Sequence, residues 1–358
     1  LKRVRELLQP YNRRLMFWGD IALNHPDLLP NVPRDMIAMN WDYAPRESYD
    51  ARIGLFKKAG LEQFVCPGVW SWNQIFPNTD AASTNIKGFV RDGQEAGVLG
   101  MMNTQWDDDG ETLFEMTWYG IVLGAASSWQ AAPLDLAQFE RDFDWAFFRH
   151  EGDELVEATR TLGGVNKLLG INTSNDLFWR DTFTDDFQTA RARPLAEKTR
   201  EMRLSVEEAA EDCLRERARA RRNVSTVDAM RFAAERFDHL GRRMQVAEQF
   251  SRDYWDAYLN LGDRRRVRKL RAYTGAIYNS FREMAEELSV LREAYRKQWL
   301  RENRPYWLDS VLARYDLAVA RWLSRGKQLE DALRVYDQTS TLPAPSEFGL
   351  GPRHEQKN

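Results

Sequence analysis

Residues 63–73 read Gln-Phe-Val-Cys-Pro-Gly-Val-Trp-Ser-Trp-Asn, a short apolar run followed by a loop of aromatic and polar residues. An apolar run of this length, bounded by Pro and Gly, is typical of a buried strand. The same plan occurs four times in the first third of the chain, with candidate strands at residues 14–18, 36–41, 63–66 and 98–103. These four runs predict a small sheet with similar loops at the strand ends.

The segments between these runs have the pattern of helices, which we expect at residues 26–29, 49–59 and 84–96. Gly60 and Gly97 follow the two longer segments and suit helix C-caps. Alternating strands and helices predict parallel strands with right-handed crossovers, in either a barrel or a doubly wound sheet. No glycine-rich phosphate-binding motif follows any of the strands, which argues against nucleotide binding.

Each strand is followed by a cluster of aromatic and polar residues. The four clusters are Trp18-Gly19-Asp20, Trp41-Asp42-Tyr43, Trp70-Ser71-Trp72-Asn73 and Gln105-Trp106-Asp107-Asp108-Asp109-Gly110. In a barrel, the carboxyl ends of the strands meet at one mouth, where a ligand binds. Flat indole faces suit the apolar faces of sugar rings. The alternative is that the tryptophans pack between helices and the carboxylates cap helix N-termini.

The sequence changes character after Trp129. Long segments rich in Arg and Glu predict helices at residues 195–222, 226–261, 265–303 and 307–336. We therefore expect three parts: residues 1–132 as an α/β domain, 133–338 as a helical domain and 339–358 as a flexible tail. Acidic residues interleave the basic runs near residues 215–222 and 264–271, which favours solvated helix faces over a nucleic-acid interface.

Composition excludes several classes of protein. The chain has 358 residues, of which 43% are hydrophobic, and a formal net charge of −3, so no global field attracts nucleic acid or an anionic membrane. No apolar run is long enough for a transmembrane segment. The two cysteines and four histidines have no metal-ligand spacing, and we expect no cofactor. Cytoplasmic and exported locations both stay open.

The strand-end motifs carry a family resemblance. The segments M-F-W-G-D-I-A-L-N-H-P-D-L-L-P, I-A-M-N-W-D-Y, F-V-C-P-G-V-W-S-W-N and N-T-Q-W-D-D-D-G, followed by G-I-V-L-G-A-A-S-S-W, resemble bacterial family 20-type β-N-acetylhexosaminidases over residues 1–130. The resemblance implies that the four strands are the fifth to eighth of a (β/α)8 TIM barrel, with the first four before Leu1. It also places the catalytic Asp-Glu pair upstream of this chain, so no residue here is expected to be catalytic.

The resemblance also implies substrate-binding roles. Trp18, Trp41, Trp72 and Trp106 match positions that wall the pocket for a terminal N-acetylhexosamine, and Asp108 matches a carboxylate that holds sugar hydroxyls. Asn73 stands near a position where the family has Asp, which is a departure from the pattern. Asp20 and Tyr43 complete the expected binding set.

The expected function is therefore that of a fragment of an exo-acting glycoside hydrolase. Such an enzyme removes terminal β-linked N-acetylhexosamine by substrate-assisted retaining catalysis, and this chain alone is expected to be inactive. One alternative is a non-catalytic carbohydrate-binding or scaffold protein, and another is a barrel glycosidase that uses Asp20 or Asp108 as acid or nucleophile. Half a barrel leaves unpaired strand edges, which predicts self-association or marginal stability.

Overall fold

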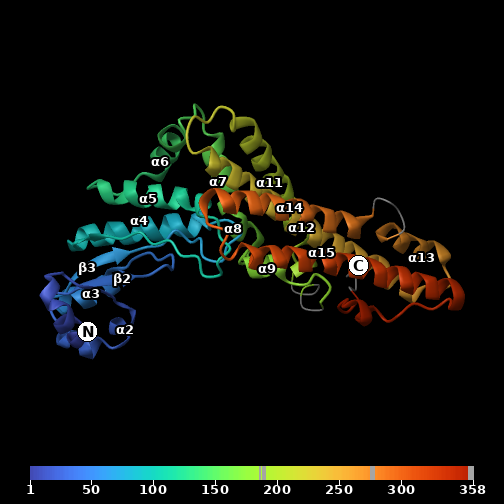
Figure 1. Cartoon of the computed structure of the whole chain (residues 1–358), viewed down its shortest axis with the longest axis horizontal. Coiled ribbons are helices and arrows are strands. Elements are labelled where there is room, and N and C mark those ends of the chain that lie inside the picture. The colour runs from blue at the N-terminus through green and yellow to red at the C-terminus, as the bar shows by residue number, and fades with distance from the viewer. Residues whose placement is uncertain (185–186, 188–190, 275–278, 354–358) are drawn as a thin grey trace. The chain divides into compact units, whose positions relative to one another are not determined.

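The computed structural model describes residues 1–184, 187, 191–274 and 279–353. The chain divides into two compact units, Leu1–Gly164 and Val165–Asn358. We call them the sheet unit and the helical unit. In Figure 1 the sheet unit runs from blue to green, and the helical unit from green to red.

The sheet unit contains one four-stranded parallel sheet, in the order β1-β2-β3-β4. The strands are β1 (Met16–Trp18), β2 (Ile37–Trp41), β3 (Glu62–Cys66) and β4 (Gly100–Met101). Each lies within or beside the run that its sequence pattern predicts. Because neighbours in the chain are neighbours in the sheet and all run parallel, every connection is a crossover.

Helices form these crossovers. They are α2 (Asp20–Asn24) and η2 (Pro26–Asn31) after β1, α3 (Asp50–Lys58) after β2, and α4 (Thr79–Ala96) after β3. The side chain of Asn78 accepts a hydrogen bond from the backbone N–H of Ala81 and so starts α4 before the predicted residue 84. Gly97 ends it with a φ of +70°, a left-handed conformation that suits glycine.

Further helices complete the sheet unit. They are α1 (Lys2–Leu8), η1 (Gln9–Tyr11), η3 (Phe114–Thr117), α5 (Trp118–Trp129), α6 (Leu136–Phe143), the π-helical turn η4 (Asp144–Phe148) and α7 (Glu154–Gly163).

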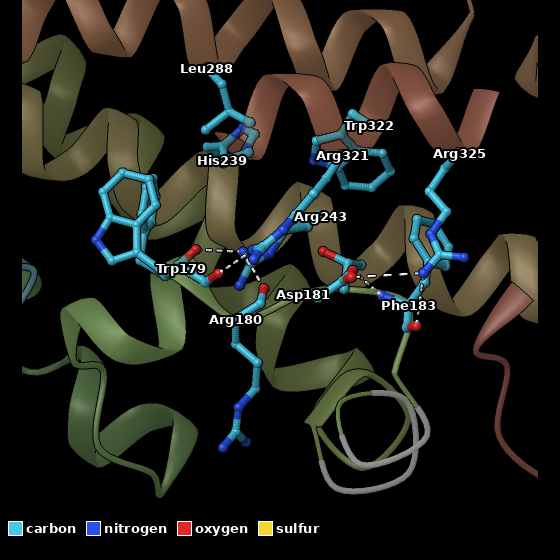
Figure 2. Close-up of a pocket in the computed structure, with 13 residues that line it drawn as sticks. Trp179, Arg180, Asp181, Phe183, His239, Arg243, Leu288, Arg321, Trp322 and Arg325 are labelled. Atoms are coloured by element: carbon cyan, nitrogen blue, oxygen red, sulfur yellow. Dashed lines mark hydrogen bonds and ion pairs between the residues drawn. The ribbon is translucent and has the colours of Figure 1, made fainter. Parts of the chain in front are cut away.

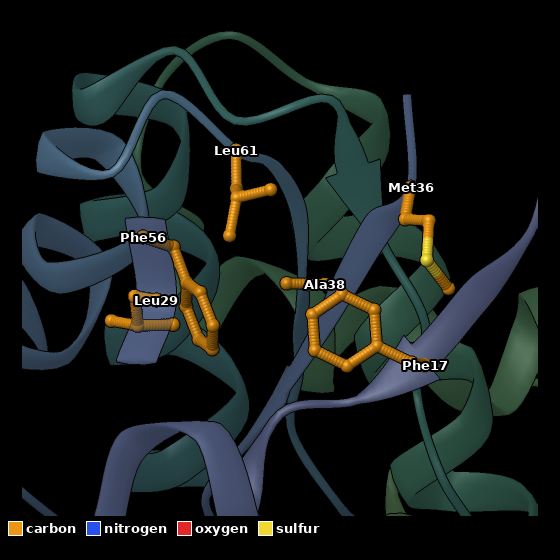
Figure 3. Close-up of a cluster of buried hydrophobic side chains, with 6 residues drawn as sticks. All are labelled: Phe17, Leu29, Met36, Ala38, Phe56 and Leu61. Carbon is orange, nitrogen blue, oxygen red and sulfur yellow. The ribbon is translucent and has the colours of Figure 1, made fainter. Parts of the chain in front are cut away.

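Two hydrophobic clusters hold the helices against the sheet. In the first, shown in Figure 3, Phe17 and Ala38 of the strands meet Phe56 of α3, and Leu29, Met36 and Leu61 complete the cluster. In the second, Val65 of β3 meets Ile53 of α3 and Phe89 of α4, and Tyr49 stacks on Phe89. The strand ends are thereby fixed relative to one another.

The helical unit contains no described strand. Its helices are α8 (Val165–Leu169), α9 (Asn175–Trp179), α11 (Ala196–Glu216), α12 (Val224–Leu259), α13 (Arg264–Leu270), η6 (Arg271–Tyr273), α14 (Ser280–Glu302), α15 (Leu308–Thr339) and η7 (Pro345–Phe348). Figure 1 shows α12, α14 and α15 side by side. Among the residues that the structure describes, no helix has the length and apolar character that crossing a bilayer requires.

The predicted helix at 265–303 is wrong as a single element. The described part contains α13, η6 and α14, and residues 275–278 of the prediction lie outside the described residues. Asn279 starts α14 because its side chain accepts a hydrogen bond from the backbone N–H of Arg282. A local capping residue therefore divides a segment that helical periodicity alone joins.

The predicted fold class, α/β plus all-α with the second half of a TIM barrel, is also wrong. The described strands, of two to five residues, form an open four-stranded sheet in a chain that is mostly helical, rather than strands 5 to 8 of a barrel. Alternating strands and helices are common to barrels and open sheets, so the pattern did not distinguish them.

Candidate functional site

Six aromatic side chains gather at the carboxyl edge of the parallel sheet. We call this set the aromatic edge, and it consists of Trp18, Trp41, Tyr43, Trp70, Trp72 and Trp106. Each ring stands at the end of a strand or in the loop that follows it. Because parallel strands end at the same side of a sheet, four separate loops bring these rings together.

The rings contact one another in two rows. Trp41 stacks on Tyr43 with ring centroids 4.9 Å apart, and Tyr43 lies 4.8 Å from Trp72. Trp72 is 5.2 Å from Trp70, and Trp18 is 5.9 Å from Trp106. These separations are those of favourable aromatic pairs.

Tyr43 joins the two rows. Its hydroxyl accepts a hydrogen bond from Nε1 of Trp106 at 2.7 Å, and its backbone carbonyl accepts one from Nε1 of Trp70 at 2.6 Å. Partial burial raises the pKa of Tyr43, and the Asp108 carboxylate adds to this rise. Hydrogen bonds with Thr104 and Trp106 lower the pKa and so oppose it. The hydroxyl therefore stays protonated near neutral pH, and Asp108 lies within electrostatic reach of it.

The loops after β3 and β4 are fastened together. Gly68 pairs with Thr104 beyond the ends of the strands, and the hydroxyl of Ser71 donates to the carbonyl of Trp106 at 3.2 Å. A β-carbon at Gly68 would lie 2.9 Å from Cδ1 of Tyr43 and 3.0 Å from Cζ3 of Trp72. Glycine at this position lets both rings pack directly on the backbone.

Two residues of the β3 loop adopt unusual backbone conformations. Trp70 has a φ of +54° and Asn73 a φ of +52°, which is rare for residues other than glycine. Such conformations cost on the order of 1–3 kcal/mol and cluster at functional sites. The side-chain oxygen of Asn73 accepts a hydrogen bond from Nε2 of Gln74 at 3.0 Å.

The faces of the outer rings are open to solvent. Trp18 is 43% exposed and Trp106 is 41% exposed, while the other four rings are half-buried. An exposed indole with an inner row of fixed rings offers a flat apolar platform. Such a platform can receive the apolar face of a ring-shaped ligand.

The carboxylates at the strand ends differ in their surroundings. Asp42 is buried and forms ion pairs with Arg46 at 2.8 Å and Arg52 at 3.3 Å, so it anchors the loop that carries Tyr43. Asp20 begins α2 and is half-buried, and its charge favours the protonated form of Arg52. Asp108 is exposed beside the aromatic edge.

Asp107 has a raised pKa because its carboxyl group is partly desolvated. The backbone N–H groups of Thr112 and Glu111 donate to Oδ1 at 3.1 and 3.2 Å and oppose the rise, while the neighbouring Asp109 adds to it. By contrast, burial raises the pKa of the Cys66 thiol to about 12, which leaves it without nucleophilic character at neutral pH.

The structure thus brings together most of the predicted binding set. Trp18, Trp41, Tyr43, Trp72 and Trp106 contact one another, with Asn73 and Asp108 in the same loops. Asp20 lies at the end of β1, where it interacts with Arg52. Trp70 and Gly68 were missing from the predicted set, although Trp70 lies in the predicted aromatic cluster at residues 70–73. The importance of Gly68 shows only when the ring contacts are known.

No family model matches the chain, and no curated protein matches it. Among solved structures, the chain is similar to a GH138 enzyme targeting pectin rhamnogalacturonan II, with a TM-score of 0.45 and 10% sequence identity. The match covers 90% of this chain and 58% of that enzyme, so the chain spans less than two thirds of its neighbour's length.

The resemblance to family 20-type β-N-acetylhexosaminidases is wrong. No family model, for those enzymes or any other family, matches the chain. Short aromatic motifs after strands are common to many sheet proteins with ligands at their strand ends, so they did not identify one family. The predicted N-acetylhexosamine specificity and substrate-assisted mechanism rested on that resemblance and are withdrawn with it.

Proposed function

We propose that the aromatic edge binds a carbohydrate. The observation that carries this proposal is the pair of partly exposed indoles, Trp18 and Trp106, in front of a row of fixed aromatic rings. Sugar rings stack on such surfaces through their C–H faces, and nearby carboxylates and amides hydrogen-bond to their hydroxyls. Asp108 and Asn73 supply those polar groups here.

The proposal is tested by titrating the full chain with a panel of neutral and acidic oligosaccharides. Binding is measured by tryptophan fluorescence and by calorimetry. We expect Trp18→Ala and Trp106→Ala each to weaken binding by about tenfold or more, because an aromatic stacking contact is worth on the order of 1 kcal/mol or more. Trp129→Ala is the matched control, since Trp129 lies in the same unit, is 93% exposed and is outside the aromatic edge. Equal effects of all three substitutions would contradict a specific site.

A second candidate function is glycoside hydrolysis at the same edge. The raised pKa of Asp107 favours it, because a carboxyl group whose pKa is raised holds its proton to higher pH and is better suited to act as general acid toward a glycosidic oxygen. Asp107→Asn is then expected to lower the release of reducing ends by about 100-fold or more while leaving oligosaccharide affinity within about twofold. Asp80→Asn, an exposed change at the start of α4, is the control. If hydrolysis is undetectable in the wild-type chain, binding alone remains the proposal.

A further inference from the structure

The helical unit encloses a small cavity that is lined by arginines from two helices. Its volume is about 20 Å³. Arg243 comes from α12, Arg321 and Arg325 come from α15, and the segment that follows α9 supplies Asp181. Figure 2 shows the side chain of Arg180 extending away from the other three guanidinium groups. We call this site the arginine cavity.

Positive charge exceeds negative charge around the arginine cavity. Three guanidinium groups line it, and Asp181 is the one acidic side chain among its lining residues. Asp181 already has partners: its Oδ1 accepts from the backbone N–H of Phe183 at 3.0 Å, and its Oδ2 lies 3.7 Å from Arg325. An uncompensated cluster of buried or half-buried cations favours an anion beside it.

Arg243 is the most deeply placed of the three, with 5% of its surface exposed. Its Nη1 and Nη2 donate to the carbonyl oxygens of Phe178 and Leu177 at 2.5 and 2.7 Å, so both are committed to the backbone. Its Nε–H has no partner among the described residues. Burial lowers the pKa of Arg243 to about 9. The charge of Asp181 opposes this shift, and that of Arg321 acts in the same direction as burial.

His239 provides a second unmatched group in the wall of the cavity. Its Nδ1 lies 3.0 Å from Oε2 of Glu287. Burial keeps the imidazole neutral by lowering its pKa to about 3, and an ionised carboxylate can only accept, so Nδ1 carries the proton. Nε2 is therefore an acceptor, and it has no donor among the described residues.

Two buried polar groups without partners, Nε of Arg243 and Nε2 of His239, thus belong to residues that line the cavity. We propose that the arginine cavity is a binding site for an oxyanion of the phosphate class. Phosphate oxygens accept from Arg243 Nε and from Arg321, whose Nη1 already donates to the carbonyl of Trp179 at 3.1 Å. The P–OH group of hydrogen phosphate donates to Nε2 of His239.

Size and hydrogen content narrow the choice of anion. A volume of about 20 Å³ is only slightly above the roughly 10–15 Å³ that admits one water-sized group, so the site takes a small ion or a terminal group. Chloride offers no donor to His239. Sulfate is fully deprotonated near neutral pH and offers none either, which would leave Nε2 buried without a partner.

The test uses the full chain in chloride, sulfate and phosphate buffers of equal ionic strength at pH 7. We expect phosphate to raise the thermal midpoint and to bind, by calorimetry, about tenfold more tightly than sulfate, because one buried acceptor is satisfied only by phosphate. Methyl phosphate forms a separate arm. This arm is run at pH 6, where about half of a phosphate monoester still carries a P–OH group that can donate to His239. Binding equal to that of inorganic phosphate at the same pH indicates a terminal phosphate of a larger ligand, and binding of inorganic phosphate alone indicates the free ion.

Two variants test whether phosphate binds in the arginine cavity. Arg321→Gln is expected to weaken phosphate binding by about tenfold, since a charge-assisted hydrogen bond is lost. Arg334→Gln on the same helix is the control, because Arg334 is exposed and pairs only with Asp331 among the described contacts. The proposal is overturned if phosphate and sulfate bind the wild-type chain equally tightly and raise its thermal midpoint equally. It is also overturned if Arg321→Gln and Arg334→Gln lose phosphate binding to the same extent.

Discussion

At the scale of single residues, Gly68 controls how closely the inner rings of the aromatic edge approach the sheet. We predict that Gly68→Ala displaces Tyr43 and Trp72, because the added methyl group would overlap both rings. Carbohydrate affinity should fall at least tenfold, with a stability cost of about 1–2 kcal/mol. Gly54→Ala in α3 has open space around its β-carbon and serves as control. Unchanged affinity in Gly68→Ala, measured by calorimetry, would contradict this role.

Asp144 makes the stability of the sheet unit depend on pH. Burial raises the pKa of Asp144 from 3.8 to about 7, with partial opposition from backbone hydrogen bonds and His150, while Glu154 adds to the rise. A carboxyl group whose pKa is higher in the folded state binds more protons there, so stability falls as pH rises from about 4 to 7. The loss is at most about 4 kcal/mol.

We predict that Asp144→Asn reduces this pH dependence, because asparagine carries no charge to bury. The measurement is the urea midpoint of the wild type and the variant between pH 4.5 and 8. The difference in midpoint should grow in favour of the variant as pH rises. Asp142→Asn changes an exposed carboxylate two residues away and should leave the wild-type pH dependence intact. A constant difference between the wild type and Asp144→Asn at every pH would rule out titration of Asp144 in this range.

At the scale of elements, a buried arginine of α12 fixes the end of α9. Arg243 donates to the carbonyls of Leu177, Phe178 and Arg180, groups that a helix end leaves without partners. We predict that Arg243→Met destabilises the helical unit by about 3 kcal/mol or more, because several carbonyls lose their donor. Arg252→Met on the same helix removes an exposed guanidinium from an i,i+4 pair with the buried Glu248, which keeps Arg193 as a partner at 3.7 Å, and should cost less than about 1 kcal/mol. Chemical denaturation compares the two, and similar costs would refute the capping role.

The sequence predicted elements better than their assembly. Strand positions followed from apolar runs such as residues 63–66, and the meeting of Trp18 with Trp106 follows from parallel strand ends. Their role in binding remains a prediction. Sheet closure depends on strand tilt and twist, which periodicity does not encode, and this explains the error over the barrel. The arginine cavity was missed because Arg243 and Arg321 lie 78 positions apart, in helices whose charges fit solvated faces.

At the scale of the whole molecule, each unit has a hydrophobic core of its own. Phe17, Ala38 and Phe56 belong to the core of the sheet unit, whereas Phe250 and Phe281 pack together within the helical unit. Separate cores permit separate unfolding transitions, and Asp144→Asn and Arg243→Met each change the stability of one unit. We predict that calorimetry resolves two transitions, with Asp144→Asn moving one of them and Arg243→Met the other. The controls Asp142→Asn and Arg252→Met should move neither by more than a few degrees. If every substitution shifts a single common transition, the two units unfold as one cooperative structure. The pH dependence that arises at Asp144 would then also affect the stability of the helices that form the arginine cavity.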